Sequence, residues 1–169
     1  KINDLISFHG KGYSDNPKAI YEEIIQDERF KGYRFIWFIK DHKRKNITIP
    51  GAEIKEYFSL SYFYYMSKAK YWIKIARCLY TFVKKESVYL QTWHGTPLKR
   101  LAHDIDVSED TTFYRSAVTY EQMCNSYDVD VARYNYMISP MRFVPSVSSA
   151  FGINKERLIE TGIQEMILS

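Results

Sequence analysis

Short runs of apolar residues alternate along the chain with polar, turn-forming segments. Six of these runs are short, apolar and rich in aromatic or β-branched side chains, a pattern that predicts strands. They cover residues 5–8, 33–41, 71–75, 88–93, 134–139 and 157–161. The run 33–41, with the sequence YRFIWFIKD, is the clearest of the six because aromatic and β-branched residues dominate it.

Segments of helical composition lie between these runs, at 17–27, 59–70, about 114–132, and from Pro140 to about Ala150. Asp15 or Asn16 is suited to cap the first helix, and Pro17 fits its first turn. Strands that alternate with helices predict parallel βαβ units, and so an α/β fold with a Rossmann-like open, mostly parallel sheet and flanking helices. Ligands of such sheets bind beyond the carboxyl ends of the strands. Because no repeat or linker is evident, we expect a single domain over residues 1–169.

Composition narrows the class of protein only slightly. The chain has 169 residues, of which 46% are hydrophobic and 26% charged, as in a globular domain. A net charge of +4 favours anionic partners such as phosphates, nucleic acid or an acidic membrane surface. Two distant cysteines, Cys78 and Cys124, indicate neither a disulfide framework nor a zinc site. The chain begins at Lys1 without a signal peptide or a membrane-spanning run, so we expect a cytoplasmic fragment of a longer protein.

The segment TWHGTPLKR, residues 92–100, carries the strongest chemical signal. His94 follows a predicted strand, where a neutral imidazole could take a proton from a hydroxyl group, and Gly95 permits close backbone approach. For a single histidine, a structural role with a hydrogen bond to a nearby carbonyl is the more common alternative. If Thr96 caps a helix, Lys99 and Arg100 lie at its positive end, where each cation costs about 0.3–1 kcal/mol. A phosphate at that end would explain them, whereas side chains that simply extend into water would need no ligand.

A second histidine–glycine pair, His9-Gly10 followed by Lys11, lies at the end of the first predicted strand. Its spacing is not that of a Walker loop. Asp104 could orient a histidine or bind a sugar hydroxyl, or could simply be a solvated loop carboxylate. The aromatic residues between 58 and 72 outnumber what one helix face can bury, so some of them could meet a membrane interface or an amphipathic acceptor.

Residues 89–105, YLQTWHGTPLKRLAHDI, closely resemble the signature of the CDP-glycerol glycerophosphotransferase family, the bacterial teichoic acid primases and polymerases. The segments SFHGKGYSDNPKAIYE, YYMSKAKYW, YNYMISP and AFGINKERLIETG resemble flanking family segments in the same order, so the resemblance covers nearly the whole chain. It implies a GT-B architecture of two Rossmann-like lobes. This chain would be the N-terminal, acceptor-side lobe, and the nucleotide-binding C-terminal lobe would be absent from it.

The resemblance also implies an activity and a site. Glycerol phosphate would pass from CDP-glycerol to a lipid-linked (poly)glycerol phosphate acceptor, with release of CMP, at the cytoplasmic face of the bacterial cell membrane. His94 would be the catalytic base, and Asp104 could orient it. The residues that would bind substrate or phosphate are Gly95, Thr96, Lys99, Arg100, His9, Gly10 and Lys11. No cofactor or metal ligand is implied, and a role for a divalent ion stays open.

Two departures from the family pattern keep an alternative open. The sequence GIQEMI at 162–167 stands where relatives read Gly-Tyr-Pro-Arg-Asn-Asp, and KIARC at 74–78 stands where relatives often carry an Asn-Ser/Thr-Arg-like run. The first of these departures puts donor handling in doubt. The alternative is a non-catalytic or degenerate module that binds a polyanionic polymer or an anionic membrane. Nucleic acid is not an expected partner, because no RRM, KH or helix-turn-helix signature is present.

Overall fold

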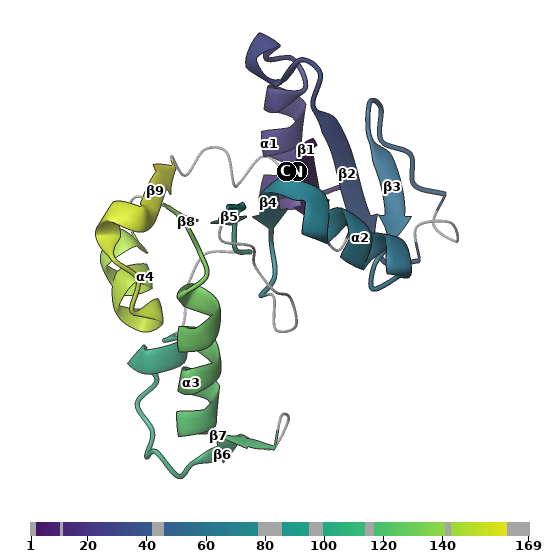
Figure 1. Cartoon of the computed structure of the whole chain (residues 1–169). Helices are drawn as coiled ribbons and strands as arrows, with labels where there is room; N and C mark the ends of the chain where they lie inside the picture. The colour runs from purple at the N-terminus through teal and green to yellow at the C-terminus, as the bar shows by residue number, and fades with distance from the viewer. Residues whose placement is uncertain are drawn as a thin grey trace.

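The computed structural model describes residues 3–10, 12–41, 46–77, 86–94, 100–113, 117–140 and 143–161. Within these ranges a seven-stranded sheet is flanked by α-helices, and a small two-stranded hairpin stands apart (Figure 1). The strands are β1 (Asn3–His9), β2 (Arg34–Ile39), β3 (Glu53–Glu56), β4 (Ala69–Lys74), β5 (Val88–Gln91), β6 (Thr112–Phe113), β7 (Val118–Thr119), β8 (Tyr136–Pro140) and β9 (Leu158–Thr161). The α-helices are α1 (Asp15–Ile24), α2 (Leu60–Lys68), α3 (Tyr120–Val131) and α4 (Val144–Phe151). Short 3₁₀ turns are η1 (Glu28–Phe30), η2 (Ala102–Asp104) and η4 (Lys155–Arg157).

The large sheet has the strand order β3-β2-β1-β4-β5-β8-β9, and every neighbouring pair is parallel. The predicted α/β fold with an open parallel sheet is therefore confirmed. The chain adds strands on one side of β1 as far as β3 and then returns to add β4 on the other side. The strand order thus reverses between β1 and β4, and in open sheets of this kind ligands bind beyond the carboxyl ends of the strands at such a point.

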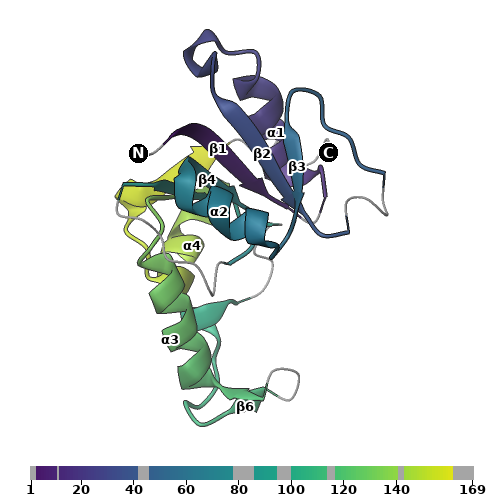
Figure 2. The same ribbon diagram turned by 45° about the vertical axis from the view of Figure 1, so that its right-hand side comes forward.

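Each face of the sheet has its own apolar core. On one face, residues of α2 and α4 pack against alternate residues of the strands, as with Tyr62 of α2 and Phe151 of α4. On the other face, Tyr21 of α1 packs against Phe8 of β1 and Phe35 of β2. The helix α3 leaves the sheet and carries the β6–β7 hairpin at its far end (Figures 1 and 2). Apolar packing on both faces therefore supports the strands whose carboxyl ends form the edge of the sheet.

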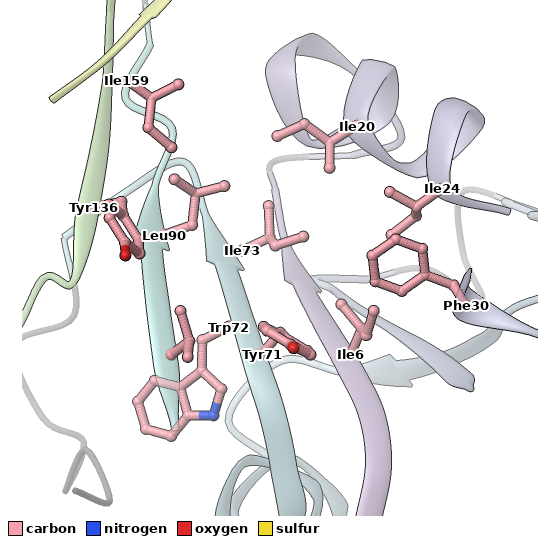
Figure 3. Close-up of a pocket in the computed structure, with 11 residues that line it drawn as sticks. Ile6, Ile20, Ile24, Phe30, Tyr71, Trp72, Ile73, Leu90, Tyr136 and Ile159 are labelled. Atoms are coloured by element: carbon pink, nitrogen blue, oxygen red, sulfur yellow. The ribbon is translucent and has the colours of Figure 1, made fainter. Parts of the chain in front are cut away.

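The α1 face is only partly covered. Beside α1, an apolar cavity of about 240 Å³ lies over β4, β5, β8 and β9 (Figure 3). Its wall includes Ile20 and Ile24 of α1, Ile73 of β4, Leu90 of β5 and Ile159 of β9. Side chains of parallel strands are apolar on both faces because both are normally buried, and these strands follow that pattern.

Several local expectations are corrected. The helix α1 begins at Asp15, and its N-cap is Ser14 rather than Asp15 or Asn16. The helix expected from 59 to 70 ends at Lys68, because the chain turns directly into β4. The helix expected from 114 begins only at Tyr120, after the β6–β7 hairpin. The pattern does not predict the strand β3, since its alternating charges (EIKE) offer no apolar run.

The helix expected to begin at Thr96 would start within the segment 95–99. Residues 95–99 lie outside the described ranges, but Arg100 and Leu101 have no regular structure and Ala102–Asp104 form a single 3₁₀ turn. The helix start expected at Thr96 therefore stays a prediction, and none of the described residues from Arg100 to Asp104 is in an α-helix.

Candidate functional site

The turn after β1 is built around a glycine that has no room for a side chain. A Cβ atom on Gly10 would lie 2.7 Å from the carbonyl oxygen of Gly12, which is too close for any real contact. A Cβ atom on Gly12 would meet nothing within 4 Å. Lys11, between them, lies outside the described residues. Gly10 and Gly12 therefore lie close together where the chain leaves β1 and leads into α1, at the point where the strand order reverses.

His9, the last residue of β1, is buried rather than displayed at the edge, with 3% of its surface exposed. Its ring packs against Phe38, Tyr57 and Tyr62, at centroid distances of 4.9, 6.1 and 5.6 Å. Its Nε2 lies 3.4 Å from Ser7 Oγ, and its Nδ1 has no hydrogen-bond partner among the described residues. Burial, and then the positive charge of Lys74, hold the pKa of His9 well below its usual value.

A histidine with such a lowered pKa is neutral at physiological pH, so the ring brings no charge that would attract a phosphate. Its buried and neutral state does not favour the phosphate-binding role expected of His9, which stays a prediction. Gly10, by contrast, brings its backbone to the edge of the sheet without a side chain, in the way that close approach of a ligand requires. Its proposed role also stays a prediction.

The residue after β5, Thr92, is tied to two neighbouring elements. Its N–H and its Oγ1 both donate to the carbonyl oxygen of Lys74 at the end of β4, over 2.8 and 3.1 Å. Its own carbonyl oxygen accepts a hydrogen bond of 2.9 Å from Asn16 Nδ2 in the first turn of α1. Strands β4 and β5 and helix α1 therefore meet at Thr92, two residues before His94.

Trp93 holds an unusual backbone conformation between Thr92 and His94. Its φ of 53° lies in the left-handed region, which costs a non-glycine residue about 1–3 kcal/mol and needs support from its surroundings. That support includes a hydrogen bond of 3.0 Å from its N–H to Gln91 Oε1. The Trp93 ring also packs edge-on against Phe151 of α4, at 4.8 Å between centroids.

The His94 ring lies on this platform. It stacks on Trp93 with 4.9 Å between ring centroids and an interplanar angle of 8°, and its side chain is exposed. His9 ends β1 and His94 follows β5, the two strands that flank β4, but of these two histidines only His94 is accessible to a substrate. An exposed imidazole in a fixed orientation at the carboxyl edge of a parallel sheet can accept a proton from a bound hydroxyl.

Arg100 and Asp104, two of the described residues that follow His94, each have a partner other than His94. Arg100 Nη1 lies 3.7 Å from Asp106 Oδ2, and both side chains are exposed, so this ion pair contributes at most about 1 kcal/mol. Asp104 Oδ1 accepts a hydrogen bond of 2.6 Å from Ser149 Oγ, which joins η2 to α4. Its expected role in orienting His94 stays a prediction, as does phosphate binding by Arg100.

A carboxylate–histidine pair does occur nearby, between two residues that sequence reasoning does not connect. His103 Nε2 lies 2.6 Å from Asp128 Oδ1, across the contact between η2 and α3. The other residues assigned to the site, Gly95, Thr96 and Lys99, fall in the segment 95–99 that the structure does not describe. Their roles stay predictions.

Sequence reasoning also misses the residues that hold the His94 turn. It suggests Asn16 only as a helix cap, whereas the Asn16 amide binds Thr92. It treats Gln91 and Trp93 only as parts of a strand. A signal exists for Gln91, because an uncharged polar residue at an inward position of a buried strand needs partners for its amide.

Arg77 lies three residues past β4, within the segment 74–78 that departs from the family pattern. Its guanidinium stacks on Tyr127 at 3.9 Å and donates to Ser126 Oγ.

The described part of the chain contains no group of three or more His, Cys, Asp or Glu side chains that could hold a metal ion. In the same ranges, no helix is both long and apolar enough to cross a membrane.

Comparison with known proteins identifies the family to which the chain belongs. The family model described as CDP-glycerol:poly(glycerophosphate) glycerophosphotransferase matches residues 4–164, almost the entire chain. The chain belongs to this family. Among curated relatives, it is 38% identical to a teichoic acid poly(glycerol phosphate) polymerase of Staphylococcus epidermidis, over 92% of this chain and 21% of that protein. It is 33% identical to the Bacillus spizizenii protein of the same name, over 92% of this chain and 39% of that protein.

Solved structures agree with the family assignment. The chain is similar to the wall teichoic acid polymerase TagF, with a TM-score of 0.83 and 34% identity. The match covers 96% of this chain and 39% of the TagF chain. This chain therefore spans only about a fifth to two-fifths of the length of these relatives.

Proposed function

We propose that this chain forms the acceptor-side part of an enzyme that transfers glycerol phosphate from CDP-glycerol to a lipid-linked (poly)glycerol phosphate acceptor in teichoic acid synthesis. Membership of the glycerophosphotransferase family supports the reaction class. The single structural observation that supports a catalytic role for this part is the placement of His94. Its ring is exposed at the carboxyl edge of the sheet, on a turn fixed by β4, β5 and α1.

The proposed step moves one proton and exchanges one P–O bond. The acceptor hydroxyl oxygen attacks the β-phosphorus of CDP-glycerol while the imidazole of His94 takes the hydroxyl proton. The bond between the β-phosphorus and the oxygen that bridges to the α-phosphate breaks, and CMP leaves with that oxygen. General base action of this kind contributes about 10²–10⁴-fold to a rate.

The donor side is proposed to lie mainly outside this chain. TagF has been solved as a histidine-to-asparagine variant soaked with CDPG, and the match to that structure covers 39% of its length. We assign nucleotide binding to a second lobe within the remaining length. The residues Gly10, Lys11, Gly95, Thr96, Lys99 and Arg100 are proposed to shape or charge the phosphate side of the cleft between the lobes.

Product analysis tests the reaction class. The full-length protein that contains this chain is incubated with CDP-glycerol and a lipid-linked glycerol phosphate primer. The expected result is CMP and primer-bound glycerol phosphate in equal amounts, with no CMP when the primer is omitted. Equal CMP release with and without primer would mean hydrolysis and would contradict transfer to an acceptor.

Contact with an anionic membrane surface is a second part of the proposal, and an exposed aromatic patch supports it. The patch consists of Phe58, Leu60, Phe63 and Tyr64 around the start of α2, with exposed fractions between 48% and 90%. Lys68 lies over the Tyr64 ring at 5.9 Å. Exposed aromatic side chains beside cations are typical of surfaces that bind the headgroup region of anionic bilayers. A lipid-linked acceptor and a soluble nucleotide donor would meet at the cytoplasmic face of the membrane.

Vesicle sedimentation tests this contact and separates the two functions. We expect the protein to sediment with vesicles that contain phosphatidylglycerol, and a Phe63→Ser/Tyr64→Ser variant to sediment less. Val129→Ser, which changes an exposed apolar residue of α3, is the matched control and should sediment like the wild type. Equal sedimentation of both variants would contradict the patch. Vesicle binding by a protein that releases no CMP would favour the non-catalytic module.

A further inference from the structure

A chain of buried polar groups runs behind the turn that carries His94. Gln91 Oε1 accepts the N–H of Trp93 over 3.0 Å, and Gln91 Nε2 lies 3.3 Å from the hydroxyl oxygen of Tyr134. The Tyr134 hydroxyl in turn donates to Asp130 Oδ2 over 2.6 Å. Asp130 lies at the end of helix α3, and Tyr134 lies between α3 and β8. The three side chains thus connect the end of α3 to the backbone beside His94.

These three polar side chains lie in the interior, where apolar side chains would have no cost of desolvation. Gln91, Asp130 and Tyr134 are at most 3% exposed, and the Tyr134 ring packs edge-on against Tyr89 at 4.9 Å. A buried polar group is costly unless its hydrogen bonds are satisfied, and a satisfied network adds rigidity and direction rather than bulk. The network therefore calls for an explanation beyond filling the core.

Each hydrogen bond of this network has a fixed donor and a fixed acceptor. Burial, and then the negative charge of Asp130, hold the pKa of Tyr134 far above its usual range, so the hydroxyl stays protonated. Its O–H group therefore donates the hydrogen bond, and Asp130 Oδ2 accepts it. The Tyr134 oxygen is then left to accept from the NH₂ group of Gln91. Gln91 must consequently turn its carbonyl oxygen toward the N–H of Trp93. A flipped amide would place two donors against each other there.

The far end of the network meets a residue with an unusual backbone conformation. Trp93 has a left-handed backbone that a bulky residue adopts only when its surroundings impose it, and Gln91 supplies the hydrogen bond at that point. His94 stacks on the same Trp93. We infer that Asp130, Tyr134 and Gln91 are positioning residues that fix the Trp93 backbone and, through it, the orientation of the His94 ring.

The attachment of Tyr134 gives this positioning a mechanical basis. The next residue, Asn135, donates its N–H to the carbonyl oxygen of Tyr89 and accepts the N–H of Tyr89 through Oδ1, over 2.9 and 2.7 Å. The backbone beside Tyr134 is therefore held against β5 by two hydrogen bonds of the adjacent residue. The Tyr134 ring thus extends from a fixed backbone position toward Gln91, whose Nε2 lies 3.3 Å from the Tyr134 hydroxyl oxygen.

Two variants of the full-length protein test the inference. Tyr134→Phe removes one oxygen atom and keeps the ring, and Gln91→Met removes the amide and keeps most of the volume. Tyr136→Phe is the matched control, because Tyr136 lies two residues away with an exposed side chain. The readout that does not depend on activity is the nuclear magnetic resonance signal of the His94 Hε1 proton, which is displaced by the stacked Trp93 ring. Histidine labelled with ¹³C at Cε1 gives the signals, and His94→Gln assigns this one.

The expected result is that the His94 signal moves toward the position of an unstacked histidine in Tyr134→Phe and in Gln91→Met, but not in Tyr136→Phe. Because misplacement of a reacting group by about 1 Å can cost about 10²-fold, we expect kcat for CMP release to fall about tenfold to a hundredfold, with KM for CDP-glycerol unchanged. This kinetic part rests on the proposed function.

The outcomes separate the inference from the function on which it rests. If either Tyr134→Phe or Gln91→Met folds and leaves the His94 signal unmoved, the positioning role is overturned, whatever the activity of that variant. A moved signal with unchanged kcat would overturn its link to catalysis. If the wild-type protein released no CMP, the proposed function would fail, while the signal would still decide whether the three residues position His94.

Discussion

Gly10 and Gly12 stand two residues apart in the turn after β1, and only one of them lacks room for a side chain. A Cβ atom on Gly10 would meet the Gly12 carbonyl oxygen at 2.7 Å, so a backbone atom would have to move. We expect Gly10→Ala to lower the free energy of unfolding by about 1–3 kcal/mol, the usual cost of overpacking. Chemical unfolding followed by tryptophan fluorescence measures it.

Gly12→Ala is the control, since its Cβ atom would meet nothing within 4 Å. The substitution limits the unfolded chain and should be neutral or stabilise the protein by up to about 1 kcal/mol. Equal effects of the two substitutions would show that the β1–α1 turn relaxes freely.

The buried imidazole of His9 makes stability depend on pH. Burial and the charge of Lys74 lower its pKa in the folded state, whereas an unfolded histidine has a pKa near the ordinary value of 6.5. Below that pH the unfolded chain binds a proton that the folded protein refuses, so the contribution of His9 is complete above about pH 6.5 and is lost as the pH falls. The loss approaches about 1.4 kcal/mol per pH unit.

The free energy of unfolding at pH 7.5, 6.5 and 5.5 tests this dependence in the wild type and in His9→Gln. The stability of the wild type relative to the variant should decrease by about 1 kcal/mol between pH 6.5 and pH 5.5. A difference that stays constant over this range would show that His9 takes up its proton in the folded state as readily as in the unfolded state.

Single residues of the site are foreseeable where their chemistry is visible in the sequence. His94 can be singled out because a histidine–glycine pair follows a strand-like run. The conformation and contacts of its neighbours cannot be predicted from the sequence. The hydrogen bond from Asn16 to Thr92 joins positions that are 76 residues apart, and the left-handed backbone of Trp93 depends on tertiary packing. The burial of His9 is hidden for the same reason, since its aromatic neighbours come from β2 and α2.

Among the single elements, helix caps differ in how they bond. Thr119 caps α3 in a full capping box, in which its side chain accepts from the Gln122 N–H and the Gln122 side chain accepts from the Thr119 N–H. Ser14 caps α1 without any side-chain hydrogen bond to the helix backbone. We expect Thr119→Ala to lower the free energy of unfolding by about 1 kcal/mol.

Ser14→Ala is the matched substitution at a cap that makes no such bond, and it should change stability by less than about 0.5 kcal/mol. Urea unfolding of both variants provides the comparison. A larger loss for Ser14→Ala than for Thr119→Ala would contradict the geometry of the two caps.

Apolar runs predict most of the strands and helices, because a strand buried on two faces leaves a continuous signal. The elements that the pattern misses have no such signal. The edge strand β3 reads EIKE, with charged residues at three of its four positions, and the hairpin strands β6 and β7 have two residues each. Their pairing depends on neighbours that local pattern does not name. The helix start expected at Thr96 falls in the segment 95–99, outside the described residues, and stays a prediction.

Across the whole molecule, a parallel sheet with the order β3-β2-β1-β4-β5-β8-β9 brings the ends of β1, β4 and β5 to one edge. Residues 9, 74 and 92 thereby become neighbours, although the sequence separates them widely. The alternation of strands and helices predicts the sheet, but it cannot predict the strand order. Only the order explains why the segments around His9 and His94 flank the same strand.

The proposal that His94 acts as the base of glycerol phosphate transfer is open to a direct kinetic test. The quantity to measure is kcat for CMP release from CDP-glycerol by the full-length protein with a lipid-linked primer, in the wild type, His94→Gln and His103→Gln. His103 is the matched control because it is a histidine with its own carboxylate partner, Asp128, outside the proposed catalytic step. We expect a loss of about 10²–10⁴-fold for His94→Gln and little change for His103→Gln. Turnover of His94→Gln close to that of the wild type would show that His94 is not the base.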